Sequence, residues 1–95
     1  MNLELDETLH RLFMLTFRYE PQKVRAARFC LSDLSWYINT GRASTPFIKT
    51  LISLKGCQRK ALLNRMLNTE DASTDSRIKA AAAYIEEVQM RTKNA

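Results

Sequence analysis

Apolar residues recur every three or four positions along most of this chain, which is the period of an α-helix with one buried face. One such segment runs from Leu5 to Arg18. A second runs from Pro21 to about Thr40, since proline suits a first helical turn and Gly41 suits the left-handed residue after a helix. The expected buried stripes are Leu5, Leu9, Leu12, Phe13, Thr16 and Tyr19 in the first helix, and Val24, Ala27, Leu31, Leu34 and Ile38 in the second.

The region after Gly41 predicts two short helices. Ser44, Thr45 and Pro46 combine a capping residue with a first-turn proline and open a helix. If that helix continued to Leu67, charged residues would fall on its apolar face, so we expect a break near Gly56. The expected buried residues are Phe47, Ile48, Leu51, Ile52 and Leu54 before the break, and Leu62, Leu63 and Met66 after it.

A polar segment from Asn68 to Asp75 predicts a loop, and either Thr74 or Asp75 is expected to cap a last helix. That helix places Ile78, Ala81, Ile85 and Val88 on one side. The whole pattern predicts an all-α fold: a single domain over residues 1–95, built as a compact bundle of four to five helices, with residues 91–95 frayed.

Composition supports helix and a cytoplasmic location. Glycine and proline occur twice each in 95 residues, which disfavours disorder and turn-rich β folds. No stretch approaches the roughly 20 apolar residues of a membrane span, and the first residues are acidic where a signal peptide is basic. Cys30 and Cys57 lie in apolar patterns without metal-site spacing, so we expect two reduced core thiols.

The sequence argues against catalysis. The single histidine, His10, falls on the outer edge of the first helix, away from any residue that it could activate as a nucleophile. The chain also lacks a glycine-rich phosphate loop and a His-Glu-x-x-His motif. We therefore expect a binding protein with no enzymatic activity, no cofactor and no metal site.

Charge is the most informative feature. The segment from Pro21 to Asn68 holds nine basic residues against one acidic residue, Asp33, a formal charge of +8. A segment of this length with almost only positive charges favours an anionic partner, although a solvated surface is the plainer interpretation.

The second helix combines charge with aromatic rings. One arc carries Arg25, Arg28, Ser32, Ser35 and Asn39, and Phe29 and Trp36 lie beside it. The strip is suited to holding phosphates while the rings stack on bases, or to forming the rim and anchor of a protein interface. Two further interpretations stay open: the rings belong to the core, or they pack against a second copy in a homodimer.

The region around Gly56 has a weaker similarity to a helix-turn-helix. Leu51, Cys57 and Leu62 suit the apolar positions of that motif, whereas Ile52, Lys55 and Arg65 do not. In such a motif Gln58, Arg59, Lys60 and Asn64 would contact bases and phosphates. The alternative is an ordinary helical turn.

A resemblance is carried by Leu9, Leu12, Phe13, Pro21, Gln22, Arg25, Ala27, Phe29 and Leu31. These residues resemble an uncharacterised family of small proteins carried on bacterial integrative and conjugative elements. Pro21 stands where that family has glycine, Asp33 and Leu34 replace its paired tryptophans, and its Gly-Gly-Phe-Asp run is missing. The resemblance implies a mobile-element or phage origin and no particular activity.

Two hypotheses follow. The protein binds nucleic acid or a ribonucleoprotein through its basic centre, or it is a mobile-element inhibitor or adaptor, of an anti-defence kind, that docks on an acidic host protein. Both hypotheses use the same candidate residues, which are Arg25, Arg28, Trp36, Arg42, Lys49, Lys55, Arg59, Lys60, Asn64 and Arg65.

Overall fold

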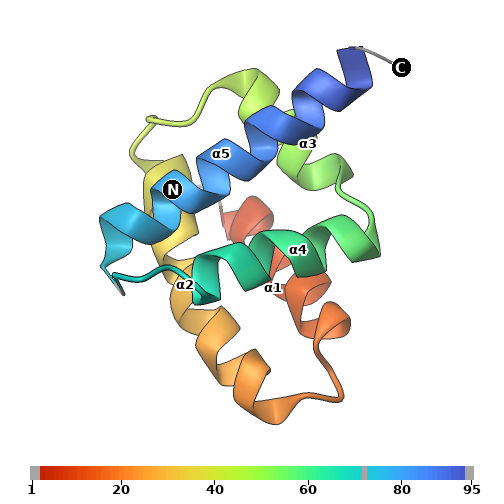
Figure 1. Ribbon diagram of the computed structural model, residues 1–95, viewed down its shortest axis with the longest axis vertical. Coiled ribbons are helices and arrows are strands. Elements are labelled where there is room, and N and C mark those ends of the chain that lie inside the picture. Colours follow the sequence, from red (N-terminus) through yellow and green to blue (C-terminus); the bar gives the residue numbers. More distant parts are fainter. Residues whose placement is uncertain (1–2, 72, 94–95) are drawn as a thin grey trace.

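Five helices make up the regular structure of the computed structural model, which describes residues 3–71 and 73–93 (Figure 1). They are α1 (Leu3–Thr16), α2 (Pro21–Asn39), α3 (Thr45–Ser53), α4 (Gly56–Leu67) and α5 (Thr74–Lys93). Those two ranges contain no β-strand. The all-α prediction is confirmed, including the interruption near Gly56. The last helix continues to Lys93, and residues 94–95 lie outside the described part.

The helices pack around one centre, within a body of 36 × 29 × 28 Å. The α1 and α2 helices form a hairpin, and α5 crosses it together with α4, its most extensive packing partner (Figure 1). The α3 helix packs on α5. Because α2 lies against α1, α4 and α5, three sides of it are partly covered and one long face remains open to solvent.

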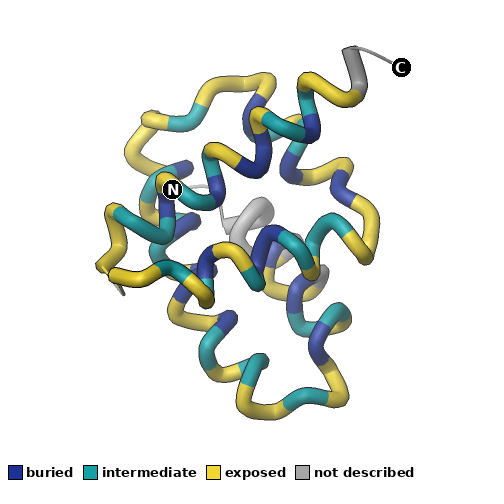
Figure 2. The backbone as a smooth tube through the Cα atoms, viewed as in Figure 1, coloured by how far each residue is buried: buried dark blue, intermediate teal, exposed yellow. Residues whose placement is uncertain are grey.

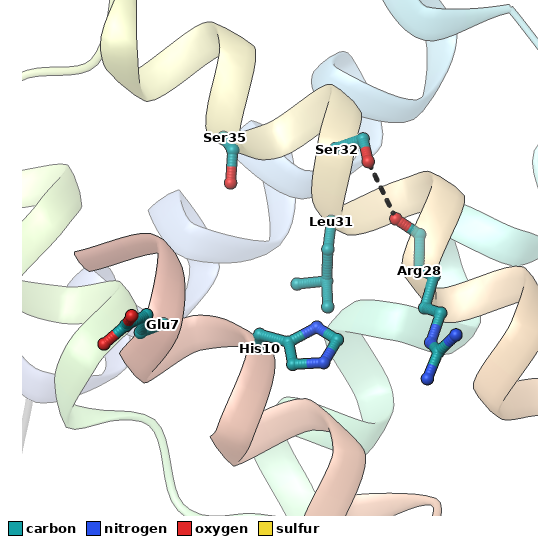
Figure 3. Close-up of a pocket in the computed structure, with 6 residues that line it drawn as sticks. All are labelled: Glu7, His10, Arg28, Leu31, Ser32 and Ser35. Carbon is teal, nitrogen blue, oxygen red and sulfur yellow. Dashed lines mark hydrogen bonds between the residues drawn. The ribbon is translucent and has the colours of Figure 1, made fainter. Parts of the chain in front are cut away.

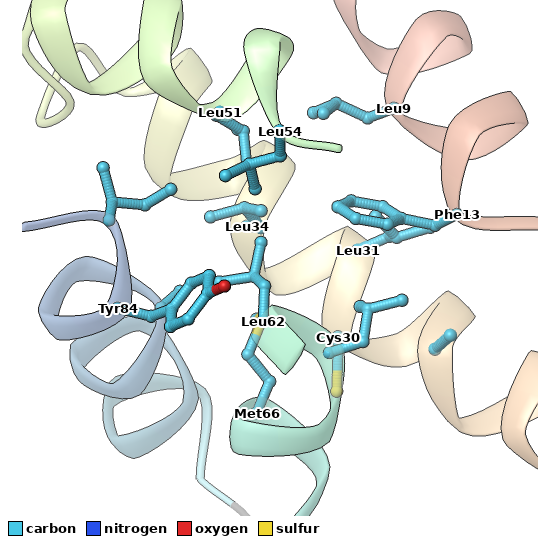
Figure 4. Packing of buried hydrophobic residues seen from close by; sticks show 14 of the residues in the cluster. Leu9, Phe13, Cys30, Leu31, Leu34, Leu51, Leu54, Leu62, Met66 and Tyr84 are labelled. Atoms are coloured by element: carbon cyan, nitrogen blue, oxygen red, sulfur yellow. The ribbon is translucent and has the colours of Figure 1, made fainter. Parts of the chain in front are cut away.

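The core draws apolar side chains from every helix (Figures 2 and 4). Within the described residues, no charged or polar side chain is buried. The buried set is Leu9, Phe13, Phe17, Ala27, Cys30, Leu31, Leu34, Ile38, Phe47, Leu51, Leu54, Leu62, Leu63, Met66, Ile78, Ala81, Tyr84, Ile85 and Val88. The stripes predicted for α4 and α5 are therefore confirmed, and so is most of the α2 stripe, in which Val24 is only partly buried.

Local signals in the sequence account for the helix ends. Ser44 caps α3 by accepting a hydrogen bond from the Phe47 backbone N–H at 3.3 Å. Gly41 follows α2 with a φ of 75°, a conformation that favours glycine. The Ser73 hydroxyl oxygen accepts from the Ser76 N–H at 3.3 Å just before α5 begins. The prediction that Thr74 or Asp75 caps this helix was therefore wrong by one or two residues.

The α1 stripe was partly wrong. This helix ends at Thr16, so Tyr19 lies beyond the helical period and is 79% exposed, whereas Phe17 turns into the core. Thr16 is only partly buried. The structure describes only the backbone of Leu5 and Leu12, so their predicted burial lies outside what it describes.

Two further burial predictions fail near the break. Ile52 is 46% exposed, whereas Phe47, Leu51 and the following Leu54 are buried. Ile48, one turn before Ile52, is only partly buried against the core. Cys57 is exposed in the first turn of α4, whereas Cys30 is buried as expected. Burial raises the pKa of the Cys30 thiol. No described helix is both long enough and apolar enough to cross a bilayer.

Candidate functional site

The open side of α2 carries aromatic rings and guanidinium groups together. Arg25 lies three and four residues before Arg28 and Phe29, Ser32 lies four and three residues after them, and Trp36 lies four residues after Ser32. The five residues therefore share one side of the helix. All five are exposed, and the exposed fractions of the two rings are 70% for Phe29 and 51% for Trp36. We call these five residues together with Arg42 the α2 face. The interpretation of the rings as core residues is therefore wrong.

Arg42 joins this face from the loop after α2. Its guanidinium carbon lies 5.3 Å from the centroid of the Trp36 ring, within the range of a cation–π contact. The contact brings a third arginine to the face although Arg42 itself is not helical.

An open groove runs between α1 and α2 beside this face (Figure 3). Its walls are Glu7, His10, Arg28, Leu31, Ser32 and Ser35. The Ser32 hydroxyl donates a hydrogen bond to the Arg28 carbonyl oxygen at 3.1 Å. In Figure 3 the His10 ring extends toward the side that carries Arg28, whereas Glu7 points away from it. The groove thus has a cationic end and an acidic end.

A second groove, more apolar, opens near the turn that joins the two helices. It is lined by Met14, Leu15, Arg18, Pro21, Val24, Arg25 and Arg28. Arg28 lines both grooves, so this side chain lies where they meet. A smaller hollow lies at the other end of the α2 face, between Ser32, Asp33, Trp36 and Thr74.

The positive charges of the α2 face are not neutralised by any carboxylate among the described side chains. Arg25, Arg28 and Arg42 form no ion pair with any carboxylate among them. Asp33, the single acidic residue of α2, is turned toward α5. It accepts hydrogen bonds there from Arg77 at 3.4 Å and from the Thr74 hydroxyl at 3.2 Å. The face therefore presents cations and rings to solvent.

Two of the basic residues on α4 have internal partners. Arg59 donates to the Leu54 carbonyl oxygen at 2.7 Å and to the Thr16 hydroxyl at 3.3 Å, which ties the start of α4 to α1. Arg65 forms two parallel hydrogen bonds with Glu87, of 2.9 and 2.8 Å. These bonds hold the pKa of the Glu87 carboxyl below its ordinary value and raise the pKa of Arg65.

The remaining candidates lie on elements other than α2. Lys49, Lys55 and Lys60 are exposed on α3, on the α3–α4 connection and on α4, and Asn64 is half-buried. The helix-turn-helix hypothesis is weakened, because Gln58 accepts the Lys55 backbone N–H at 2.9 Å and Arg59 is held as described above. Two of the four proposed base readers are thus engaged within the chain.

Sequence reasoning missed one feature near the α1–α2 turn. The guanidinium carbon of Arg18 lies 4.4 Å from the ring centroid of Tyr19, so a second cation–aromatic pair is exposed there. The Glu20-Pro21 pair was the available signal, since the residue before a proline is biased away from helix and α1 had to end earlier.

Among the described side chains, no group of three or more His, Cys, Asp or Glu residues is placed to hold a metal ion. No family model, curated protein or solved structure matches this chain. The function is therefore argued from the surface itself. The homodimer through Phe29 and Trp36 stays a prediction, since both rings are exposed on the single chain.

Proposed function

We propose that this protein is a non-enzymatic binding protein that takes up nucleic acid through the α2 face. The observation that carries this proposal is the combination on one face of arginines without carboxylate partners and exposed aromatic rings. Arginine is suited to phosphate oxygens, because its planar fork of donors matches their geometry. Aromatic rings add stacking on bases, an attraction that phosphate contacts do not provide.

The location of the basic side chains without carboxylate partners also supports the α2 face as the binding surface. Arg59 and Arg65 are engaged within the chain, so the free positive charge of the basic segment is concentrated on Arg25, Arg28 and Arg42 and on the exposed lysines. We place the activity in the cytoplasm, a reducing compartment, in keeping with two free cysteines.

A fluorescence anisotropy titration of labelled oligonucleotides tests the proposal. The double variant Arg25→Ala/Arg28→Ala should lose at least about tenfold in affinity at low salt, and its plot of log affinity against log salt should be shallower by about two units. The matched control, Lys79→Ala/Arg91→Ala, removes the same formal charge from exposed positions on α5 and should change the affinity by less than about threefold. Equal losses of affinity in the two variants would show that binding depends only on the net charge of the protein. That result would contradict the assignment of binding to the α2 face.

The second groove favours a second candidate function. Leu15 is exposed, and with Met14, Pro21 and Val24 it gives the turn between α1 and α2 an apolar lining beside Arg25 and Arg28. A protein inhibitor or adaptor of mobile-element type would use this patch as its anchor and the arginines as its rim on an acidic host protein. Under this alternative, oligonucleotides fail to bind at low salt, and Leu15→Asp abolishes capture of the host partner while Arg42→Ala only weakens it.

A further inference from the structure

The exposed rings on the α2 face help to decide whether the nucleic acid that binds there is single-stranded or double-stranded. In a duplex the bases are stacked on one another and present only their edges in the grooves, so a protein ring finds no free base face. An unpaired strand leaves base faces open, and stacking on aromatic side chains is how single strands are commonly held. Phe29 and Trp36 are large, exposed and on the same side of one helix.

The spacing of these rings leaves room for backbone between them. Phe29 and Trp36 are seven positions apart in α2, which is about 10 Å along the helix axis at 1.5 Å per residue. Ser32 lies between them in sequence and lines the groove between α1 and α2. The His10 ring extends toward the end of that groove where Arg28 lies (Figure 3), and Phe29 directly follows Arg28 in the helix. Ser32 also lines the hollow beside Trp36, so this end of the groove lies close to both rings.

We infer that the ligand is a single strand, with one base stacked on Phe29, a second base stacked on Trp36, and a backbone phosphate between them held in the α1–α2 groove by Arg28 and His10. Arg28 contributes charge and a fork of donors, and the His10 imidazole contributes an N–H donor. Glu7 lies at the other end of the groove and repels phosphate there. The inference rests on the proposed nucleic-acid function and narrows its ligand. Stacking and phosphate binding involve no 2′ position, so single-stranded DNA and RNA both fit.

The test compares oligonucleotides of one length: a single DNA strand, a single RNA strand and a DNA duplex, titrated against the full chain at a single salt concentration. We expect the single strands to bind at least about tenfold more tightly than the duplex. Phe29→Leu and Trp36→Leu should each lose at least about tenfold for single strands and leave duplex affinity nearly unchanged, while Trp36→Phe, which keeps a ring, retains most of the affinity. His10→Ala should weaken single-strand binding about threefold to tenfold, as expected for the loss of one phosphate contact.

Tyr19→Leu is the matched control, because it removes an exposed ring that lies outside the α2 face and should change the affinity by less than about threefold. Duplex binding as tight as single-strand binding, or ring variants that bind single strands normally, would overturn the inference and leave the proposed nucleic-acid function intact. A loss in Tyr19→Leu equal to that in Trp36→Leu would overturn the placement of the bases. Absence of binding to all three oligonucleotides would instead remove the proposed function itself.

Discussion

The guanidinium carbon of Arg42 lies 5.3 Å from the centroid of the Trp36 ring. This contact links the loop after α2 to the exposed side of the helix. Because one side of the indole carries the cation, a ligand that stacks on the other side meets a ring and a positive charge together. The same pairing occurs between Arg18 and Tyr19 near the other end of the helix.

The Arg42–Trp36 contact predicts energetic coupling between the two residues. Arg42→Ala and Trp36→Leu should each weaken binding of single-stranded oligonucleotide, and the double variant should lose less than the sum of the two, by at least about 0.5 kcal/mol. Anisotropy titrations of wild type, both single variants and the double variant give the cycle. Strictly additive losses would show that the contact does not contribute to ligand binding.

Arg59 is predicted to matter for stability and not for binding. Arg59→Ala removes the hydrogen bonds to Leu54 and Thr16 and should lower the free energy of unfolding by about 1–2 kcal/mol. At a temperature where wild type and Arg59→Ala are both folded, the affinity of Arg59→Ala for oligonucleotide should fall below that of wild type by no more than the affinity of Lys79→Ala does. Urea unfolding followed by circular dichroism measures the first quantity and anisotropy the second. A large loss of affinity with unchanged stability would restore the helix-turn-helix hypothesis.

The Arg65–Glu87 pair predicts a pH-dependent contribution to stability. The pKa of Glu87 is lowered in the folded protein, so the pair stabilises the fold above the pH range in which an unpaired glutamate titrates, about pH 4, and this contribution is lost as pH falls through the lowered pKa. Wild type should therefore melt at a higher temperature than Glu87→Gln at about pH 7, and the difference should shrink toward about pH 3. A difference that stays constant over this range, or that widens, would contradict the pair's role.

The core predicts a sharp contrast between two aliphatic residues of neighbouring helices. Leu62 is fully buried on α4, so Leu62→Ala should cost about 2–5 kcal/mol of unfolding free energy. Ile52 is almost half exposed on α3, and Ile52→Ala should cost less than about 1 kcal/mol. Chemical denaturation of both variants checks the pair. Similar losses would mean that Ile52 is packed more tightly than the structure places it.

The helices could be predicted from the sequence because their signals are local. The period of Leu31, Leu34 and Ile38 defines the buried face of α2 without reference to any other helix. Ser44 with Pro46 marks the start of α3, and the charges after Leu54 mark the interruption. The Tyr19 error has a local cause as well: the apolar period was extended past the true end of α1.

The candidate site could be predicted only in part, because its outcome depends on contacts between distant residues. The partners of Arg59 and Arg65 include Thr16 and Glu87, which are 43 and 22 positions away in sequence, and no local pattern announces them. The sequence also did not decide whether Phe29 and Trp36 are core residues or surface residues. Their exposure depends on which sides of α2 are covered by α1, α4 and α5, which is a property of the tertiary packing.

Trp36 allows the central claim to be tested directly, since it is the only tryptophan in the chain and lies on the α2 face. The measurement is a titration of intrinsic tryptophan fluorescence with short oligothymidylate, with Arg25→Ala/Arg28→Ala as the comparison. The account predicts saturable quenching of Trp36 emission at the concentrations where anisotropy reports binding, and a matching shift of both curves to higher concentration in the double variant. Binding by anisotropy without any change in Trp36 emission would place the ligand elsewhere on the protein and contradict the account.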